Sequence, residues 1–239
     1  MNEFGEVKKH WDDFGGKPYQ DFWNSYAHKR LSEKEEGFIK SFIPSGDIRA
    51  FDFGSGSGRI LNFLLEGTSN GAEIYGVDAS QSMVKYCRER FSNEKKIKEV
   101  NVIESVESLN RYGGGFDFIT AIRSLKYNKN WEQILANLTK ILTAHGLIVF
   151  TMPKKYFFSG LFRPADTYIR ADIGDIREIA AKNNMEVIEA KGFSRIPEFF
   201  YLVDNELFSR LVVFGEEFMR LVFGDRLFSR EVLYVLKKK

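Results

Sequence analysis

The stretch of sequence that decides the fold is Phe51-Asp52-Phe53-Gly54-Ser55-Gly56-Ser57-Gly58-Arg59-Ile60-Leu61. It begins in a short segment, 48–53, that is typical of a strand, and it ends where residues 60–65 are expected to open a helix. Glycines are needed between two such elements where the turn is tight and a ligand must lie against the backbone. The unpaired N–H groups of the helix N-terminus face the same place. The stretch therefore predicts a ligand-binding turn, with a tight turn that binds nothing as the alternative.

Two aspartates accompany this turn. Asp52 lies in the strand just before the first glycine, and Asp78 ends the next expected strand, 20 residues after Gly58. The spacing Gly-x-Gly-x-Gly differs from the Gly-x-Gly-x-x-Gly of dinucleotide-binding proteins. A carboxylate in the position of Asp78 accepts hydrogen bonds from a ribose diol. The alternatives are a helix N-cap at Asp78, for which Ser80 is the better residue, and a buried structural carboxylate at Asp52.

The rest of the chain alternates short apolar segments with helical stretches. The expected strands are 48–53, 73–77, 98–103, 116–122, 147–151, 186–190 and 232–236, and the expected helices are 32–42, 60–65, 81–91, 131–142 and 172–182, followed by an apolar helical block at 199–223. Such alternation is typical of βαβ units, in which helices cover both faces of a parallel sheet. The sequence therefore predicts an α/β fold.

Composition excludes several classes of protein. The chain has 239 residues, with 35 Lys and Arg against 33 Asp and Glu, so a strongly basic wrapper of nucleic acid is excluded. The single cysteine, Cys87, excludes a disulfide framework, and scattered histidines argue against a metal site, so no metal is expected. No apolar run reaches 18 residues and the first residues lack the features of a secretory signal. We therefore expect a cytoplasmic protein without a transmembrane segment.

The motifs resemble those of the class I, Rossmann-like, S-adenosylmethionine-dependent methyltransferases, over about residues 48–151. The segments that carry the resemblance are 52–58, 75–80 together with Met83, 116–121, and 142–147, where Ala144-His145 replaces the usual Pro-Gly. The resemblance implies a doubly wound seven-stranded sheet, mostly parallel, with a reversed last strand. It also implies S-adenosylmethionine as the cofactor and S-adenosylhomocysteine as the product.

The resemblance further divides the chain and assigns site residues. One domain, 1–239, would comprise an N-terminal helical arm (1–45), a cofactor-binding half (46–152) and a substrate-side half (153–239) with a helical insertion at about 199–223. The backbone of the three glycines would lie against the methionine part, with Asp52 near its amino group and Asp78 on the ribose hydroxyls. The implied cofactor-binding residues are Asp52, Gly54, Ser55, Gly56, Gly58, Asp78, Ala79, Met83, Ser105, Val106 and Ala121.

Some of these assignments have alternatives. Ala79 and Met83 would flank the adenine, but Met83 fits helix packing at least as well. The pair Ser105-Val106 stands where the family often has Asp-Ala, and Glu104 or Glu107 could replace that contact. Tyr26 and Arg30, on the N-terminal arm, are candidates for the cofactor carboxylate, with surface or packing roles as the alternative.

The methyl acceptor is less well defined. Arg123, Lys126 and Tyr127 follow the fourth expected strand, and ligands of this fold bind beyond the carboxyl ends of the strands. Because a cation beside a sulfonium is unfavourable unless an anion intervenes, Arg123 or Lys126 would bind a substrate carboxylate or phosphate. The alternative is that both are solvated loop charges. Tyr127 could orient the acceptor, and His10 and His28 are weak candidates for a base.

We therefore expect methyl transfer from S-adenosylmethionine to an oxygen or nitrogen of a small, anionic metabolite. The fourth strand lacks the Pro-Pro-Tyr ending of amino-group methylases of nucleic acids, and no RNA-binding module is apparent, so nucleic acid is disfavoured as a partner. The alternatives are an RNA or protein methyltransferase and a non-catalytic cofactor-binding partner subunit. For the block at 199–223, completion of the core is the preferred interpretation, followed by a lid and then by a dimer face. The chain is expected to be a monomer or homodimer.

Overall fold

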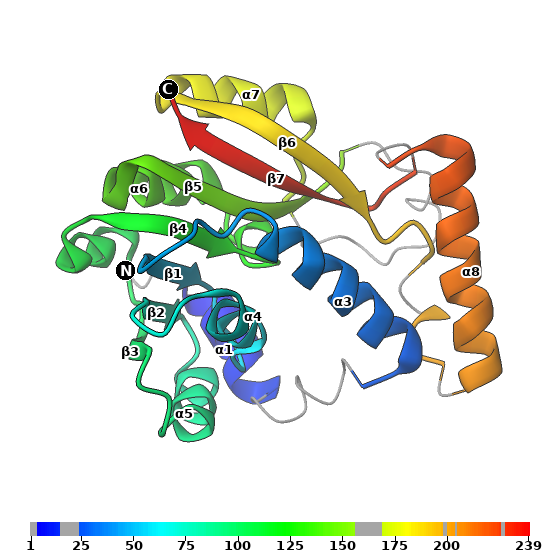
Figure 1. The fold of residues 1–239 in the computed structure, drawn as a ribbon, viewed down its shortest axis with the longest axis horizontal. Coiled ribbons are helices and arrows are strands. Elements are labelled where there is room, and N and C mark those ends of the chain that lie inside the picture. Colours follow the sequence, from blue (N-terminus) through cyan, green and yellow to red (C-terminus); the bar gives the residue numbers. More distant parts are fainter. Residues whose placement is uncertain (1–3, 15–23, 156–168, 198–199, 204, 226–227) are drawn as a thin grey trace.

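A seven-stranded sheet forms the centre of the structure, a computed structural model that describes residues 4–14, 24–155, 169–197, 200–203, 205–225 and 228–239. The strands are β1 (Arg49–Phe53), β2 (Glu73–Asp78), β3 (Ile97–Val102), β4 (Phe116–Ala121), β5 (Leu142–Pro153), β6 (Met185–Phe193) and β7 (Glu231–Lys238). Their order is β3-β2-β1-β4-β5-β7-β6 (Figure 1). The pairs from β3 to β5 are parallel, and β7 runs antiparallel to both β5 and β6. The predicted fold, with a reversed last strand, is confirmed.

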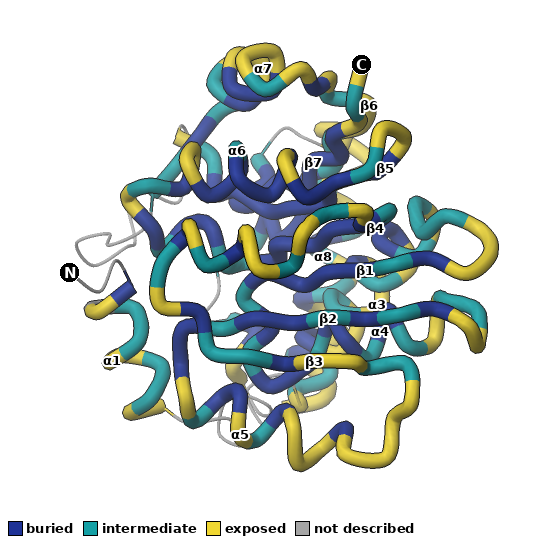
Figure 2. The backbone as a smooth tube through the Cα atoms, turned by 90° about the vertical axis from the view of Figure 1, so that its left-hand side faces the viewer, coloured by how far each residue is buried: buried dark blue, intermediate teal, exposed yellow. Residues whose placement is uncertain are grey.

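Helices cover both faces of this sheet. They are α1 (Gly5–Phe14), α3 (Tyr26–Lys40), α4 (Arg59–Gly67), α5 (Gln81–Arg90), α6 (Trp131–Ile141), α7 (Ile173–Lys182) and α8 (Glu206–Phe223), with 3-10 segments η1 (Val106–Tyr112) and η2 (Leu125–Tyr127). One core lies between the sheet and α1, α6 and α7, and the other between the sheet and α3, α4 and α5. The central strands β1, β4, β5 and β7 are largely buried between the two cores (Figure 2), which explains the apolar runs in β4, β5 and β7.

The order of the strands creates the site. The chain moves from β1 outward to β2 and β3, and then returns to place β4 on the other side of β1. At such a switch point the connections diverge and leave a crevice beyond the carboxyl ends of the strands. The backbone N–H groups of Gly54 and Ser55 both donate to the carbonyl of Val77, at 2.8 and 2.9 Å, so the glycine turn is attached to the end of β2.

Two helices differ from the sequence-based expectation. Helix α3 begins at Tyr26 rather than near residue 32, because Ser25 caps it by accepting from the N–H of His28 at 3.2 Å. Helix α8 begins at Glu206, and it packs against α3 (Figure 1). Among the described residues, no helix combines the length and apolar character needed to cross a membrane.

The expectation that the block at 199–223 completes the core is wrong for most of α8. Only Ser209, Val212 and Glu216 of this helix are buried. The large apolar side chains on the opposite side are exposed, namely Leu207, Leu211, Phe214, Phe218, Leu221, Val222 and Phe223. Residues 198, 199 and 204 lie outside the described part of the chain. Most of the apolar residues of α8 therefore form an exposed surface rather than part of the core.

Candidate functional site

A cavity of about 730 Å³, including the space at its mouth, lies beyond the carboxyl ends of β1, β2, β3 and β4. The walls come from the glycine turn and the start of α4, from the ends of β2, β3 and β4, and from α1 and η2. The lining residues are Phe4, Val7, Trp11, Phe53, Gly54, Ser55, Gly56, Arg59, Ile60, Asp78, Ala79, Met83, Ile103, Ile122, Arg123, Ser124, Tyr127 and Asn128.

The glycine turn forms one wall of the cavity. Gly54 has a φ of +78°, and a Cβ added there would lie 2.3 Å from the Cβ of Ser124. Only glycine therefore allows the ends of β1 and β4 to approach this closely. The hydroxyls of Ser55 and Ser124 are buried and have no hydrogen-bond partner among the described residues. Since buried polar atoms are normally satisfied, these two hydroxyls are suited to a ligand or water in the cavity.

Asp78 joins the glycine turn to the start of α5. Its Oδ2 accepts from the N–H of Gly56 at 2.8 Å, and its Oδ1 accepts from the N–H of Ser80 at 2.9 Å. Burial raises the pKa of Asp78, while these backbone donors act in the opposite direction. Ser80 is the N-cap of α5, accepting from the N–H of Met83 at 3.1 Å, so Asp78 is left to face the cavity. The N-cap interpretation of Asp78 is therefore wrong.

Asp52 lies beneath the turn and outside the cavity lining. Its side chain is fully buried, and its Oδ1 accepts from the hydroxyl of Thr120 at 2.8 Å. Its Oδ2 has no partner among the described residues. Burial raises the pKa of Asp52 to about 7; the Thr120 hydrogen bond opposes this shift and the nearby Asp78 adds to it. The structure therefore does not place the Asp52 carboxyl where it would contact a ligand in the cavity directly.

Helix α1 closes the cavity. Phe4, Val7 and Trp11 share the face of α1 that lines it, and the ring of Trp11 meets Tyr127 edge-on at 5.5 Å. Asp12 attaches the helix to α5: its Oδ1 accepts from the hydroxyl of Ser80 at 2.7 Å and from the N–H of Ser82 at 3.1 Å. Burial opposes ionisation of Asp12, but these hydrogen bonds hold its pKa below the ordinary value. The carboxylate also lies at the favourable end of the α5 dipole.

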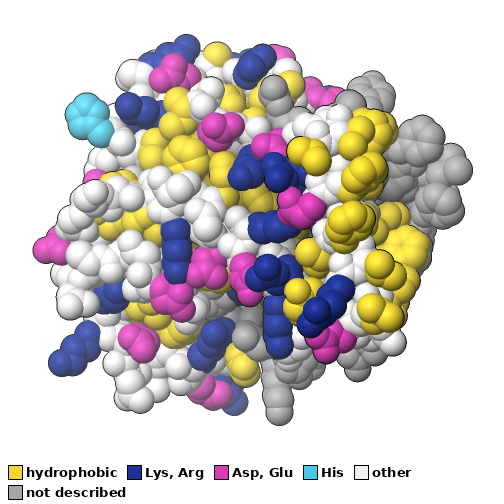
Figure 3. Space-filling view, turned by 45° about the vertical axis from the view of Figure 1, so that its right-hand side comes forward, with side chains coloured by type: hydrophobic (Ala, Val, Ile, Leu, Met, Phe, Trp, Pro, Cys, Tyr) yellow, Lys and Arg dark blue, Asp and Glu magenta, His cyan; other side chains and the backbone are white. Residues whose placement is uncertain are grey.

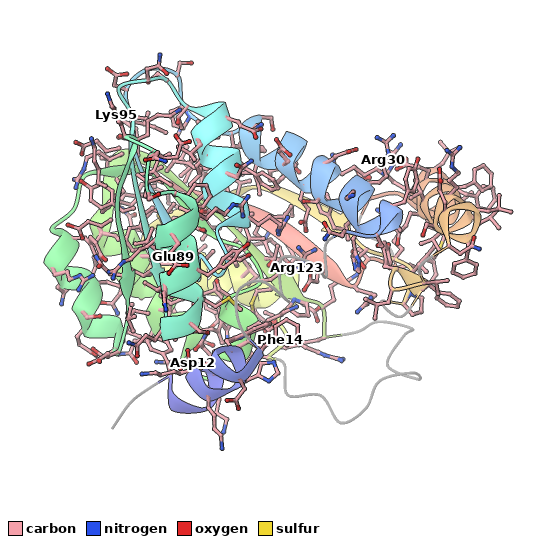
Figure 4. The ribbon with its side chains drawn as sticks, turned by 90° about the horizontal axis from the view of Figure 1, so that it is seen from below. Asp12, Phe14, Arg30, Glu89, Lys95 and Arg123 are labelled. Atoms are coloured by element: carbon pink, nitrogen blue, oxygen red, sulfur yellow. The ribbon has the colours of Figure 1, made fainter. Side chains whose placement is uncertain are left out.

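A cluster of five charged groups, here called the ion-pair cluster, lies behind the cavity wall; its members are Glu35, Arg59, Arg123, Lys126 and Glu231. Glu35 is fully buried and accepts from Arg123 through both oxygens, at 2.6 and 2.9 Å, and from Arg59 at 3.0 Å. Glu231 accepts from Arg123 at 2.9 Å and from Lys126 at 2.6 Å. Figure 4 shows Arg123 between α1 and α3. Among the described residues, the cluster thus brings three cations together with two carboxylates beside the cavity.

The cluster has two physical signatures of tight packing. Burial opposes ionisation of Glu231, but Lys126 and Arg123 outweigh it and hold the pKa of this carboxyl well below its usual range. Arg123 itself has a φ of +57°, a conformation that is uncommon outside glycine, and its N–H donates to the hydroxyl of Thr151 at 2.6 Å. The interpretation of Arg123 and Lys126 as solvated loop charges is therefore wrong. Whether Arg123 also binds a substrate anion stays a prediction.

Besides Asp52, four residues of the predicted cofactor-binding set lie outside the cavity lining. Gly58 packs against α5, where a Cβ would lie 2.3 Å from the ring of Phe91. Val106 and Ala121 are buried in the core, and Ser105 precedes η1. Ile103 and the segment 122–124 line the cavity instead. The cause is that β3 ends at Val102, three and four residues before Ser105 and Val106, while Ala121 is still the last residue of β4; the first residues past each strand reach the cavity.

Of the catalytic candidates, only Arg123 and Tyr127 line the cavity. His10 is exposed on α1, with its ring against Trp11. His28 is buried at a distance from the cavity lining, stacked on Tyr201 with its Nδ1 3.1 Å from the Ser25 hydroxyl. Arg30 pairs with Glu33 on the surface, and Tyr26 lies beside Arg210. Neither histidine is therefore placed to act as a base here.

Several lining residues were missed by sequence reasoning. Phe4, Val7 and Trp11 recur at steps of three and four, a helical face that periodicity could have identified. Arg59 follows the glycines directly, but nothing local indicates that it turns toward Glu35. Ser124 lies in the short loop before η2 and Asn128 directly follows η2, and no sequence motif marks either residue.

The fold and cavity define a Rossmann-like α/β protein with a ligand site at the switch point of its sheet. Residues 51–148 match the family model of a methyltransferase domain. No curated protein that was compared matches the chain. The matched domain, the strand order and the reversed β7 together give this chain the Rossmann-like fold of the class I S-adenosylmethionine-dependent methyltransferases.

Solved structures share the fold at low sequence identity. Magnesium protoporphyrin IX methyltransferase from Synechocystis PCC 6803, with bound S-adenosylhomocysteine, has a TM-score of 0.66 at 13% identity, with 98% of this chain and 99% of that chain covered. Phosphoethanolamine N-methyltransferase 2 from Haemonchus contortus, in complex with S-adenosyl-L-methionine, has a TM-score of 0.61 at 16% identity, with coverages of 95% and 60%. The [4+2]-cyclase SpnF has a TM-score of 0.62 at 16% identity, with coverages of 88% and 80%. At these identities the likeness is one of fold.

Proposed function

We propose that this protein transfers the methyl group of S-adenosylmethionine to a carboxylate oxygen or an amine nitrogen of a small anionic molecule. The observation that carries the proposal is the cavity between the glycine turn, Asp78 and α1, with Arg123 and the ion-pair cluster in its wall. S-adenosylmethionine supplies an electrophilic methyl group on a sulfonium centre. The protein binds, orients and screens the two reactants from water.

The lining residues fit the cofactor part by part. The orphaned hydroxyls of Ser55 and Ser124 would bind its polar amino-acid end, where a side chain at Gly54 would otherwise fill the space. Asp78 would accept from the ribose hydroxyls, since its carboxylate lines the cavity between β2 and α5. Met83 and Ile103 offer apolar surface for the adenine.

The same lining limits the chemistry of the acceptor. Among the described lining residues, Asp78 is the only carboxylate and there is no histidine. A base is needed for a weakly acidic hydroxyl, but a carboxylate or a neutral amine attacks without one. Alignment by itself supplies a large part of the rate of such a transfer. We therefore favour an acceptor that is already nucleophilic, held in place rather than activated by proton abstraction.

The ion-pair cluster supports an anionic acceptor. A guanidinium beside a sulfonium is repelled unless an anion lies between them. Arg123 lines the cavity, and it belongs to a cluster that holds three cations and two carboxylates among the described residues. A carboxylate or phosphate of the acceptor would supply the intervening anion. Tyr127, on the same wall and held against Trp11, would orient it.

The proposed function is tested by calorimetric titration with S-adenosylhomocysteine, comparing wild type with Asp78→Ala. A hydrogen bond to a charged group contributes about 1.5–3 kcal/mol, so the variant should bind about 10- to 100-fold more weakly. Because Asp78 also holds Gly56 and Ser80, the 2′,3′-dideoxy analogue of the ligand serves as a control. This analogue should bind wild type weakly, and its affinity should be no lower for the variant. Failure of folded wild type to bind the ligand would contradict the proposal.

Arg123→Gln tests the anionic acceptor. Screening small carboxylates, amino acids and phosphorylated metabolites for S-adenosylhomocysteine release would first identify the acceptor. With it, the variant should raise KM by about 10-fold or more, while its affinity for S-adenosylhomocysteine changes much less. Circular dichroism checks that the variant is folded. An unchanged KM together with weaker cofactor binding would assign Arg123 to the cofactor carboxylate. No turnover with any acceptor, despite tight cofactor binding, would favour a non-catalytic cofactor-binding subunit.

A further inference from the structure

The exposed side of α8 carries a stripe of apolar residues with a specific spacing. Leu207, Leu211, Phe214, Phe218 and Leu221 follow one another at alternating steps of four and three, and each is between 56% and 79% exposed. Figure 3 shows hydrophobic side chains gathered along this helix, at the right of the view. Alternating steps of four and three form the narrow seam of a coiled coil, whereas a helix that lies on a broad apolar surface needs a wider stripe. We call these five residues the α8 seam.

The opposite side of α8 is fixed to the rest of the protein. Glu216 is buried, and its Oε1 accepts from the N–H groups of Arg195 and Ile196, at 2.5 and 2.6 Å, and from the hydroxyl of Tyr201. Val212 packs with Ala27 and Tyr201 in a small core between α3 and α8. The seam is therefore held outward on a rigid helix and is already ordered for association, which reduces the entropy lost on binding.

The charges beside the seam specify what covers it. Arg210 and Glu217 each precede a seam residue by one position, which corresponds to position g of a heptad. We propose that the α8 seam pairs antiparallel with the α8 seam of a second copy of this chain. In that register Leu207 lies beside Phe218 of the second copy and Leu211 beside Phe214. Arg210 of each copy then lies beside Glu217 of the other, and two-fold symmetry forms the ion pair twice.

A parallel pairing lacks this complementarity. It would place the g positions against the e positions of the other helix, which are Phe208, Gly215 and Val222 and carry no charge. Arg210 now pairs with Glu206 within α8, and Glu217 pairs with Arg220 of the same helix and with Lys34 of α3; all three pairs are exposed. Exposed pairs of this kind are weak, so exchanging them for pairs between copies costs little. The charges thus favour the antiparallel dimer over the parallel dimer. They also favour it over a lipid surface, because binding to lipid does not depend on the order of Arg210 and Glu217 along the helix.

Sedimentation equilibrium of the full chain, from low to high micromolar concentration, tests the dimer. Wild type should dimerise, and Phe214→Lys should be monomeric. Arg210→Glu alone and Glu217→Arg alone should each weaken dimerisation by about 10-fold or more, because each places like charges opposite one another twice. The double variant Arg210→Glu, Glu217→Arg should recover it. Unfolding curves of each variant check that the monomer itself is unchanged.

Cysteine crosslinking tests the orientation. A mixture of Leu207→Cys and Phe218→Cys chains should form a mixed disulfide dimer, while each variant alone should not, and the native Cys87 is buried and does not interfere. Crosslinking of Leu207→Cys with itself would overturn the antiparallel register. A wild type that stays monomeric throughout, or a charge swap that fails to restore a dimer, would overturn the proposal. Binding of monomeric wild type to phospholipid vesicles would assign the seam to a lipid surface instead.

Discussion

Replacing Glu35 with glutamine is expected to lower the free energy of unfolding by about 3–5 kcal/mol. Glu35 has no exposed surface and pairs with two guanidiniums, those of Arg59 and Arg123, whose side chains are each only 12% exposed. Glutamine keeps the shape but not the charge, so both cations would remain buried with too few anions. Removing one member of a buried ion pair is costly because the remaining charge is neither solvated nor compensated. Urea denaturation followed by tryptophan fluorescence measures the loss.

Glu33→Gln is the matched control on the same helix. Glu33 pairs with Arg30 at the surface, where the two side chains are 57% and 51% exposed. Exposed pairs contribute about 0–1 kcal/mol, so this variant should remain close to wild type. If Glu35→Gln were as stable as Glu33→Gln, the ion-pair cluster would not hold α3 to the sheet, and the account of the cavity wall given above would fail.

Asp52 is expected to make the protein less stable as the pH rises from about 4 to 7. Its pKa is about 7 in the folded state, against 3.8 for an ordinary aspartate. Below both pKa values the carboxyl is protonated in the folded and unfolded chains, and its contribution to the free energy of unfolding is fully present. Between them the unfolded chain ionises while the folded chain keeps its proton, so stability falls until the pH passes the folded pKa. At about 1.4 kcal/mol for each pKa unit, the fall is roughly 4 kcal/mol.

The difference between wild type and Asp52→Asn isolates this effect, because the amide does not titrate. The variant should gain stability relative to wild type across that pH range. Asp175→Asn is a control of opposite sign: the hydrogen bond from Lys155 lowers the pKa of Asp175, so wild type should gain relative to this variant as the pH rises toward 4. Unfolding midpoints in urea measure the Asp52 difference between pH 4 and 8 and the Asp175 difference below pH 4. A flat difference for Asp52→Asn would show that its carboxyl is not perturbed by burial.

The glycine turn, Asp78 and the alternation of strands and helices could be predicted because each is encoded locally. Tight turns select glycine through backbone sterics, and strands or helices select apolar residues at their own periods. Those signals, joined to the family resemblance, indicated the strand order, the place of the site and eight members of its lining. They could not indicate that Gly58 and Asp52 face the protein interior, because the direction of each depends on where α5 and β4 pack against the turn.

The sequence by itself determined the alternation of strands and helices and the glycine turn, since short-range patterns suffice for both, while the family resemblance supplied the doubly wound strand order. Only the tertiary structure decided how charge is distributed around that site. Glu35, Arg123 and Glu231 lie 88 and 108 residues apart along the chain, yet they meet behind the cavity. It also decided that the apolar block of α8 faces outward: its heptad spacing suits a helix partner, but burial of Glu216 on the opposite side turns the seam away from the core. Contacts between distant segments are set by packing, which no local pattern records.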